Sequence, residues 1–419
     1  MTIAGVAISI GFVGSILASP TLGLVLCAVV APLSKGILQP YLGPVDLTGM
    51  VYATTLLSIG ARLVRRRRMP SFPPAAFNVL VGVFLVFLLV GYLRSPVRSY
   101  AAQLVFRFVA LDLGLLYMLI AWVQDRARLR RLALTFVWGG LLYGVLLLVS
   151  IVLIPGLLGP SMAARAVFEG TAPLTVGLFL AMGVILALSF AVSTMRAPRR
   201  LALLAFVALA VVQLVAVNSR GPLLGLALGT AVWIISSLRA VPWRRLILPA
   251  SVVVGPAVLS LFCLPQEIVA RYNPALLDLA NPAATSASAR AAMWRFVASH
   301  AGEWFVAGAG LYGFAFQYGG GPDAVAVFGA HPHNLLLEVY SSVGFFGAVC
   351  FSTLIVLPLV QAIRWALRRG VSPDEWMARG ILGALVAAFV SAFFSMGLLD
   401  TRLVWFAAGC AFCLGESHG

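Results

Sequence analysis

Two of the four histidines in the chain lie two residues apart, in the segment His331-Pro332-His333-Asn334. A long polar stretch ends at this segment and a long apolar run begins directly after it. An imidazole titrates near neutral pH and can take a proton from a hydroxyl group, which suits general-base catalysis. Hydrocarbon offers a polar ring no hydrogen-bond partner, so a span does not need histidine. The alternative is a capped helix start with a histidine at the membrane interface.

An acidic residue and two glycines follow within the apolar run. In a helix, Glu338 lies about 7–8 Å deeper than His333, at about 1.5 Å per residue. An acid at that depth is costly, so it either pairs with an arginine or tunes the histidine. A structural ion pair within a helical bundle is an equally good interpretation. Gly344 and Gly347 lie three residues apart and indicate close helix packing rather than chemistry.

The composition predicts the setting of these residues. Of 419 residues, 62% are hydrophobic and 10% are charged, whereas a soluble chain carries about 25% charged residues. Apolar runs of about 20 residues recur along the chain, which predicts an all-α polytopic membrane protein. The net charge of +16 comes largely from arginines in short loops, so no nucleic-acid partner is expected. The five scattered cysteines are expected to be buried thiols without metal-ligand spacing.

Alternating apolar runs and arginine clusters predict the topology. Arg65-Arg66-Arg67-Arg68 should be cytoplasmic, and later clusters up to Arg369 fall on the same side. Ser19-Pro20 either breaks one span or separates two short ones. The first case gives about 12 transmembrane helices with both termini inside, and the second gives about 13. We favour the first.

This topology divides the chain into three parts. Residues 1–264 form an N-terminal transmembrane bundle, residues 265–332 form one large periplasmic loop, and residues 333–419 form the C-terminal spans. Short helices are expected in the loop, one of them from Ala289 to Ser299, with Arg290 and Trp294 on a shared face.

The outer side is rich in arginine, although the charge rule predicts few arginines there. Eight arginines map to it: Arg94, Arg98, Arg165, Arg220, Arg271, Arg290, Arg295 and Arg402. Each by itself can be a lipid-facing residue whose charge reaches the headgroups. As a set they indicate an anion site, because guanidinium groups bind phosphate oxygens in a bidentate way. The outer acids are isolated in sequence, so neither a metal nor another cofactor is expected.

The motifs resemble those of a known family. His333-Asn334, nine residues and then Gly344-Phe345-Phe346-Gly347 resemble the His-Asn-x9-Gly-x-x-Gly motif of the O-antigen ligase family. That superfamily includes O-antigen polymerases and bacterial protein O-oligosaccharyltransferases. Ser219-Arg220-Gly221 is similar to its Ser-Arg-Gly at a span end. Arg290-x-x-x-Trp294 with Gly308-Ala309-Gly310 is similar to its Arg-x-x-x-Trp and Gly-x-Gly segment. Arg165 resembles the arginine of an earlier outer loop, but the usual Gly and Asn around it are missing.

The resemblance implies a periplasmic-face glycosyltransferase of the bacterial inner membrane. The donor would be O-antigen polysaccharide on undecaprenyl diphosphate, and the acceptor would be a hydroxyl of lipid A–core. His333 would be the base, Arg220, Arg290, His331 and Arg165 would bind diphosphate or glycan, and Glu338 would tune the site. An inverting, metal-independent displacement is expected if no carboxylate acts as nucleophile. The alternatives are a glycan polymerase, a protein O-oligosaccharyltransferase and, more distantly, a lipid-linked glycan transporter.

Overall fold

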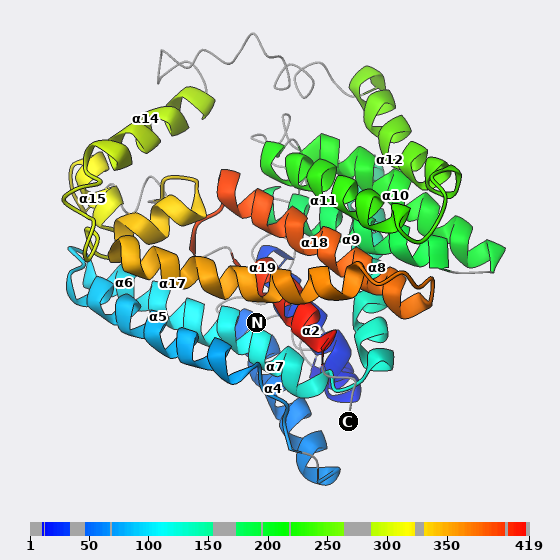
Figure 1. Cartoon of the computed structure of the whole chain (residues 1–419), viewed down its shortest axis with the longest axis horizontal. Helices are drawn as coiled ribbons and strands as arrows, with labels where there is room; N and C mark the ends of the chain where they lie inside the picture. Colours follow the sequence, from blue (N-terminus) through cyan, green and yellow to red (C-terminus); the bar gives the residue numbers. More distant parts are fainter. Residues whose placement is uncertain are drawn as a thin grey trace.

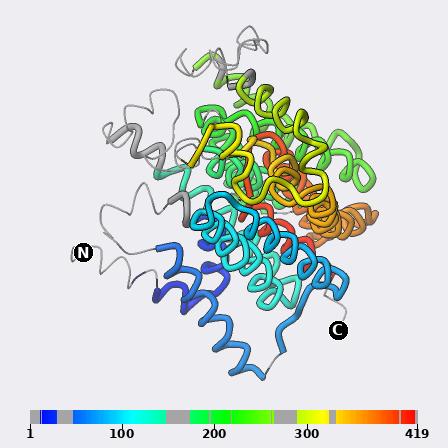
Figure 2. Tube along the Cα trace, turned by 90° about the vertical axis from the view of Figure 1, so that its left-hand side faces the viewer, coloured from blue at the N-terminus to red at the C-terminus, as the bar shows by residue number. Residues whose placement is uncertain are grey.

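The computed structural model describes residues 11, 13–33, 47–67, 69–153, 173–193, 196–217, 219–263, 286–322, 331–398 and 401–415. Within these ranges the regular structure is helical throughout, and the chain folds into the bundle shown in Figures 1 and 2. The N-terminal half contains α2 (Pro20–Leu33), α4 (Leu47–Arg65), α5 (Ala75–Leu93), α6 (Arg98–Arg107), the π-helix η2 (Phe108–Leu113), α7 (Gly114–Trp122), α8 (Arg126–Leu153), α9 (Pro173–Ser193) and α10 (Ala197–Val217). The C-terminal half contains α11 (Arg220–Leu238), α12 (Arg244–Cys263), α14 (Ser286–Ser299), α15 (Gly313–Gly319), α17 (Leu335–Ala366), α18 (Pro373–Ser395) and α19 (Arg402–Cys413).

The predicted all-α, multi-pass membrane class is confirmed. Counted over the described ranges, nine helices are long and apolar enough to cross a membrane, with α6, η2 and α7 taken together as one. Pro20–Val29 and α19 are shorter apolar helices. A break lies at the predicted place, because residues 13–18 are helical, Ser19 is not, and α2 begins at Pro20. The total of about 12 transmembrane helices stays a prediction.

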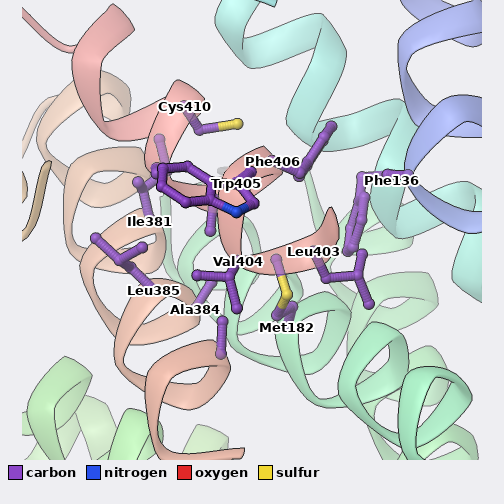
Figure 3. Close-up of a cluster of buried hydrophobic side chains, with 14 of the residues drawn as sticks. Phe136, Met182, Ile381, Ala384, Leu385, Leu403, Val404, Trp405, Phe406 and Cys410 are labelled. Atoms are coloured by element: carbon purple, nitrogen blue, oxygen red, sulfur yellow. The ribbon is translucent and has the colours of Figure 1, made fainter. Parts of the chain in front are cut away.

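The centre of the bundle consists of α9, α18 and α19, with α8 against them. Phe136 of α8 stacks on Phe406 of α19, with ring centroids 5.0 Å apart. Met182 of α9 and Ile381 and Leu385 of α18 point into the same cluster (Figure 3). These helices are apolar on nearly every face, which is typical of helices surrounded by other helices. The cluster holds α18 in the middle of the molecule.

A row of glycines brings α11 into backbone contact with α18. Gly221, Gly225 and Gly229 recur every four residues and therefore lie on one face of α11. A Cβ at Gly225 would lie 2.5 Å from the Ala387 carbonyl oxygen, and one at Gly229 would lie 2.5 Å from the Gly383 oxygen. Only residues without a side chain allow such an approach, which is the small-residue packing common between membrane helices. The contact fixes α11, and with it Arg220, against α18.

Two sequence expectations about individual side chains are wrong. Cys263 is exposed on α12, whereas Cys27, Cys350, Cys410 and Cys413 are buried as expected. Arg402 is not an accessible member of the expected anion site, because it is 6% exposed and its Nε lies 3.7 Å from Asp112 Oδ1. Asp112 belongs to η2, and its Oδ2 accepts a hydrogen bond of 2.7 Å from Thr401 Oγ1. The ion pair with Asp112 of η2 therefore stabilises Arg402 in a buried position inside the bundle.

Breaking this buried pair is expected to destabilise the protein strongly. Asp112→Ala would leave the Arg402 charge buried without its counter-ion, a change that costs about 3–5 kcal/mol in other proteins. The midpoint of thermal unfolding in detergent should fall accordingly. The matched control is Asp374→Ala, in the exposed first turn of α18, which should change stability by less than about 1 kcal/mol. Equal midpoints for the two variants would contradict a structural role for the pair.

Candidate active site

The histidine segment leads directly into α17. Asn334 is the N-cap of that helix, and its Oδ1 accepts a hydrogen bond of 3.1 Å from the Leu337 amide. His333 has a φ of +52°, in the left-handed region that residues other than glycine seldom occupy. The segment therefore caps α17 through Asn334, and it also holds His333 in an unusual backbone conformation. Capping by Asn334 leaves the His333 ring available for catalysis.

His331 and His333 form a close pair. Their ring centroids lie 4.4 Å apart, and the His333 backbone amide donates a hydrogen bond of 3.1 Å to His331 Nδ1. That bond requires an unprotonated Nδ1, which places the proton of the neutral ring on Nε2. Burial, with smaller contributions from His333 and Arg290, lowers the pKa of His331 to about 3. His331 is thus a neutral hydrogen-bond donor at physiological pH.

The environment of His333 also favours its neutral form. Burial and the positive charge of Arg290 lower the pKa of His333, and a hydrogen bond with the Ser395 backbone partly opposes that shift. A ring N–H that donates to a carbonyl holds the proton on one nitrogen and leaves the lone pair on the other. A general base needs this protonation state.

Two side chains of helix α14 form hydrogen bonds, one to the end of α18 and one to the histidine segment. Arg290 Nη1 donates a hydrogen bond of 2.9 Å to the Phe394 carbonyl oxygen. One turn further, Trp294 Nε1 donates to the Pro332 carbonyl oxygen, also at 2.9 Å. The two side chains share one face of α14, as the sequence predicted, and α14 includes the whole of the expected Ala289–Ser299 helix. The predicted phosphate ligand Arg290 is therefore held beside the histidines.

Glu338 binds the segment that follows α18. Its Oε2 accepts a hydrogen bond of 2.7 Å from the Leu398 amide, and the residue is only 8% exposed. A Cβ on Gly397 would lie 2.8 Å from that oxygen and 2.9 Å from His331 Cγ. The carboxylate, the glycine and the His331 ring are thus packed together.

Arg220 begins the helix that packs on the same end of α18. It is exposed, whereas a Cβ on its neighbour Gly221 would lie 2.5 Å from Ser395 Oγ. Ser391 Oγ donates a hydrogen bond of 3.3 Å to the Gly221 carbonyl oxygen. The structure therefore gathers His331, His333, Arg290 and Glu338 at one helix end, with Arg220 at the edge. Arg165 lies outside the described residues.

The Gly-x-x-Gly motif in α17 packs against the segment that contains the Gly-x-Gly motif. Gly344 has a φ of +81° and breaks α17, and a Cβ there would lie 2.6 Å from the Val306 carbonyl oxygen. Across this break, Phe345 donates its amide hydrogen to the Phe305 oxygen at 2.8 Å, and Ala309 donates to the Ser341 oxygen at 2.6 Å. Gly344 allows a close approach, as expected, but its partner is the connection between α14 and α15 and not another helix.

The sequence did not predict that the segment Phe394–Leu398 contributes to the site. It contains no charged side chain and contributes through its backbone groups, so no motif could reveal it. Within the described part of the chain, no group of three His, Cys, Asp or Glu side chains is arranged to hold a metal ion.

A family model covers the part of the chain that contains these residues. Residues 205–352 match a family model described as O-antigen ligase, a range that contains Arg220, Arg290, His331, His333 and Glu338. No curated protein matches the chain. A solved structure described as "Structural coordination of polymerization and crosslinking by a peptidoglycan synthase complex" aligns over 80% of this chain and 95% of its own chain, with 22% identity and a TM-score of 0.43.

Proposed function

We propose that the chain is a member of the O-antigen ligase family, whose model matches residues 205–352, and that it transfers O-antigen polysaccharide from undecaprenyl diphosphate to a hydroxyl of lipid A–core. Membership of the family itself implies a glycosyltransferase that acts on a lipid-linked glycan and a lipid acceptor. The observation that supports the finer proposal is the gathering of a neutral histidine and an arginine on adjacent backbone carbonyls, those of Ser395 and Phe394.

The proposed reaction is a single displacement with inversion. The acceptor hydroxyl oxygen attacks the anomeric carbon, and the bond from that carbon to the diphosphate oxygen breaks, leaving its electron pair on the diphosphate. The proton of the hydroxyl passes to the free ring nitrogen of His333. Undecaprenyl diphosphate leaves, and the glycan is then bound to lipid A–core. Neither a metal nor another cofactor takes part in this scheme.

Cationic and neutral donors stabilise the leaving group in this proposal. Negative charge develops on the diphosphate as the bond breaks, and fixed donors aimed at that charge lower the barrier. Arg290 and Arg220 are the guanidinium groups, and the Nε2–H of His331 is a further donor. Arg165 is assigned here from its motif position alone.

The proposed orientation follows the charge rule. The cytoplasmic end of α17 would carry Arg364, Arg368 and Arg369, so its start at Leu335 would face the periplasm of a bacterial inner membrane. The division into a bundle of residues 1–264, a periplasmic loop of residues 265–332 and C-terminal spans of residues 333–419 is part of the same proposal.

A transfer assay tests the proposed function. Purified full chain in lipid nanodiscs would receive undecaprenyl-diphosphate glycan and lipid A–core, with and without a chelator. We expect product that survives the chelator, and a loss of about 10²-fold in kcat for Arg220→Ala. The control Arg239→Ala, an exposed arginine at the other end of α11 from Arg220, should transfer normally. Longer glycans on the donor lipid alone would indicate a polymerase, and transfer to no acceptor from folded protein would contradict a glycosyltransferase.

A further inference from the structure

Three different backbone groups at the end of α18 are bound by side chains from α14, from α17 and from the histidine segment before α17. The Phe394 oxygen accepts from Arg290 of α14 at 2.9 Å, and Leu398 donates its amide hydrogen to Glu338 of α17 at 2.7 Å. Between them, the Ser395 backbone bonds to the His333 ring. We call Phe394–Leu398 the α18 terminal segment.

The α18 terminal segment is fixed rather than loosely attached. Met396 is fully buried and Leu398 is 2% exposed. Thr401 Oγ1 lies 3.1 Å from the Leu398 carbonyl oxygen. Gly397 is enclosed by Glu338 and His331, with no room for a Cβ. Any movement of this segment must therefore displace Glu338, His331 or both.

Arg290 and His333 take their positions from two successive residues of this segment. Successive Cα atoms are about 3.8 Å apart across a trans peptide, so one peptide unit sets the spacing between the two side chains. The proposed reaction needs that spacing, because Arg290 acts on the departing diphosphate and His333 acts on the incoming hydroxyl.

We propose that the α18 terminal segment is the positioning element of the transfer site and that Glu338 is a positioning residue, which anchors the segment through the Leu398 amide. Gly397 is required because a side chain there would separate Glu338 from His331. The inference rests on the proposed function for its effect on turnover. It replaces charge tuning of the histidine with hydrogen-bond acceptance as the task of Glu338.

The comparison of Glu338→Gln with Glu338→Ala tests the proposal. Glutamine keeps an oxygen that can accept from the Leu398 amide but carries no charge. We expect Glu338→Ala to lower kcat by about 10²-fold, as small misplacements of catalytic groups do, with the donor KM within about threefold. Glu338→Gln should restore most of kcat. Equal losses in both variants would show that the charge matters and would overturn the proposal.

A glycine pair supplies a second test. Gly397→Ala should lower kcat like Glu338→Ala, whereas Gly302→Ala, where no other atom lies within 4 Å of an added Cβ, should behave as wild type. Thermal unfolding midpoints identify any variant that fails to fold. Normal kcat in folded Gly397→Ala and Glu338→Ala protein would overturn the positioning role alone, because wild type and Gly302→Ala would still transfer glycan.

Hydrogen exchange separates this inference from the proposed function altogether. The Leu398 amide should be protected in wild type and in Glu338→Gln, and should exchange at least tenfold faster in Glu338→Ala, an order-of-magnitude expectation for the loss of one anchoring bond. Equal protection in all three proteins would overturn the anchor. If wild type transfers no glycan while this pattern holds, the proposed function fails and the anchor stands.

Discussion

Replacing His333 with asparagine is expected to lower kcat by about 10²–10⁴-fold, the range associated with loss of a general base. Asparagine is the informative substitution because it tolerates the left-handed backbone region that His333 occupies at φ +52°. Alanine at this position would combine loss of the ring with backbone strain. The loss from asparagine therefore reports on the imidazole, which would otherwise take the proton of the attacking hydroxyl.

The control for His333 is another histidine of the same chain. His300 follows α14, stacks on Trp304 with ring centroids 5.1 Å apart, and has Nδ1 2.9 Å from the Phe296 oxygen. His300→Asn should leave kcat within a few-fold of wild type. Single-turnover transfer with both variants makes the measurement. A His333→Asn protein that transfers glycan at the wild-type rate would eliminate His333 as the base, and one that moves lipid without transfer would favour a transporter.

Replacing Arg290 with methionine is expected to change both the rate and its pH dependence. Loss of a charged donor at the leaving group should lower kcat/KM by about 10²-fold or more. The Arg290 charge also lowers the pKa of His333, so its removal should raise that pKa toward the ordinary value of about 6.5. In the proposed mechanism the neutral His333 ring is the active form, so activity should fall on acidification. The acid limb should therefore lie below pH 6.5 in wild type and move upward in the variant.

Arg290→Lys separates the two effects. Lysine keeps the positive charge but not the bidentate geometry, so its acid limb should stay near that of wild type while the rate is reduced. The profile of kcat/KM between about pH 4.5 and 8 reports the free enzyme. His331 and Glu338 also lie at this site and remain unchanged in both variants. Identical acid limbs in wild type and Arg290→Met would contradict the electrostatic influence of Arg290 on His333.

Hydrophobic length predicted most of the transmembrane helices. The apolar run from Ala75 to Leu93 coincides with α5, and the apolar run from Ala172 to Thr194 differs from α9 by one residue at each end. The apolar run that forms most of α18 starts at Gly380, but the helix begins at Pro373. Charged residues before Gly380 are typical of a loop, yet Arg379 is fully buried and donates hydrogen bonds to the carbonyl oxygens of Ala366, Arg368 and Gly370, at the end of α17 and just after it. The free carbonyl groups near the end of α17 thus supply the hydrogen-bond partners that a buried arginine in a membrane helix needs.

The candidate site was predictable where side chains carry the chemistry. His333, Arg290 and Trp294 could be named from type and spacing, and the structure brings them together. The carbonyls of Phe394 and Ser395 could not be named, because every residue has a carbonyl and only the fold decides which ones meet a histidine or an arginine. The buried pairing of Arg402 was missed for a related reason. Its partner Asp112 lies in a π-helix that interrupts an apolar run, and hydropathy does not detect such interruptions.

The glycine face of α11 has a consequence for how the protein responds to its bilayer. Membranes differ in thickness, and helices usually adapt by tilting or sliding. Because Gly225 and Gly229 put the α11 backbone against the α18 backbone, these two helices must tilt as one unit. The position of Arg220 relative to Ser395 should then be the same in thin and thick bilayers. The proposed transfer rate should therefore change little with the thickness of the bilayer.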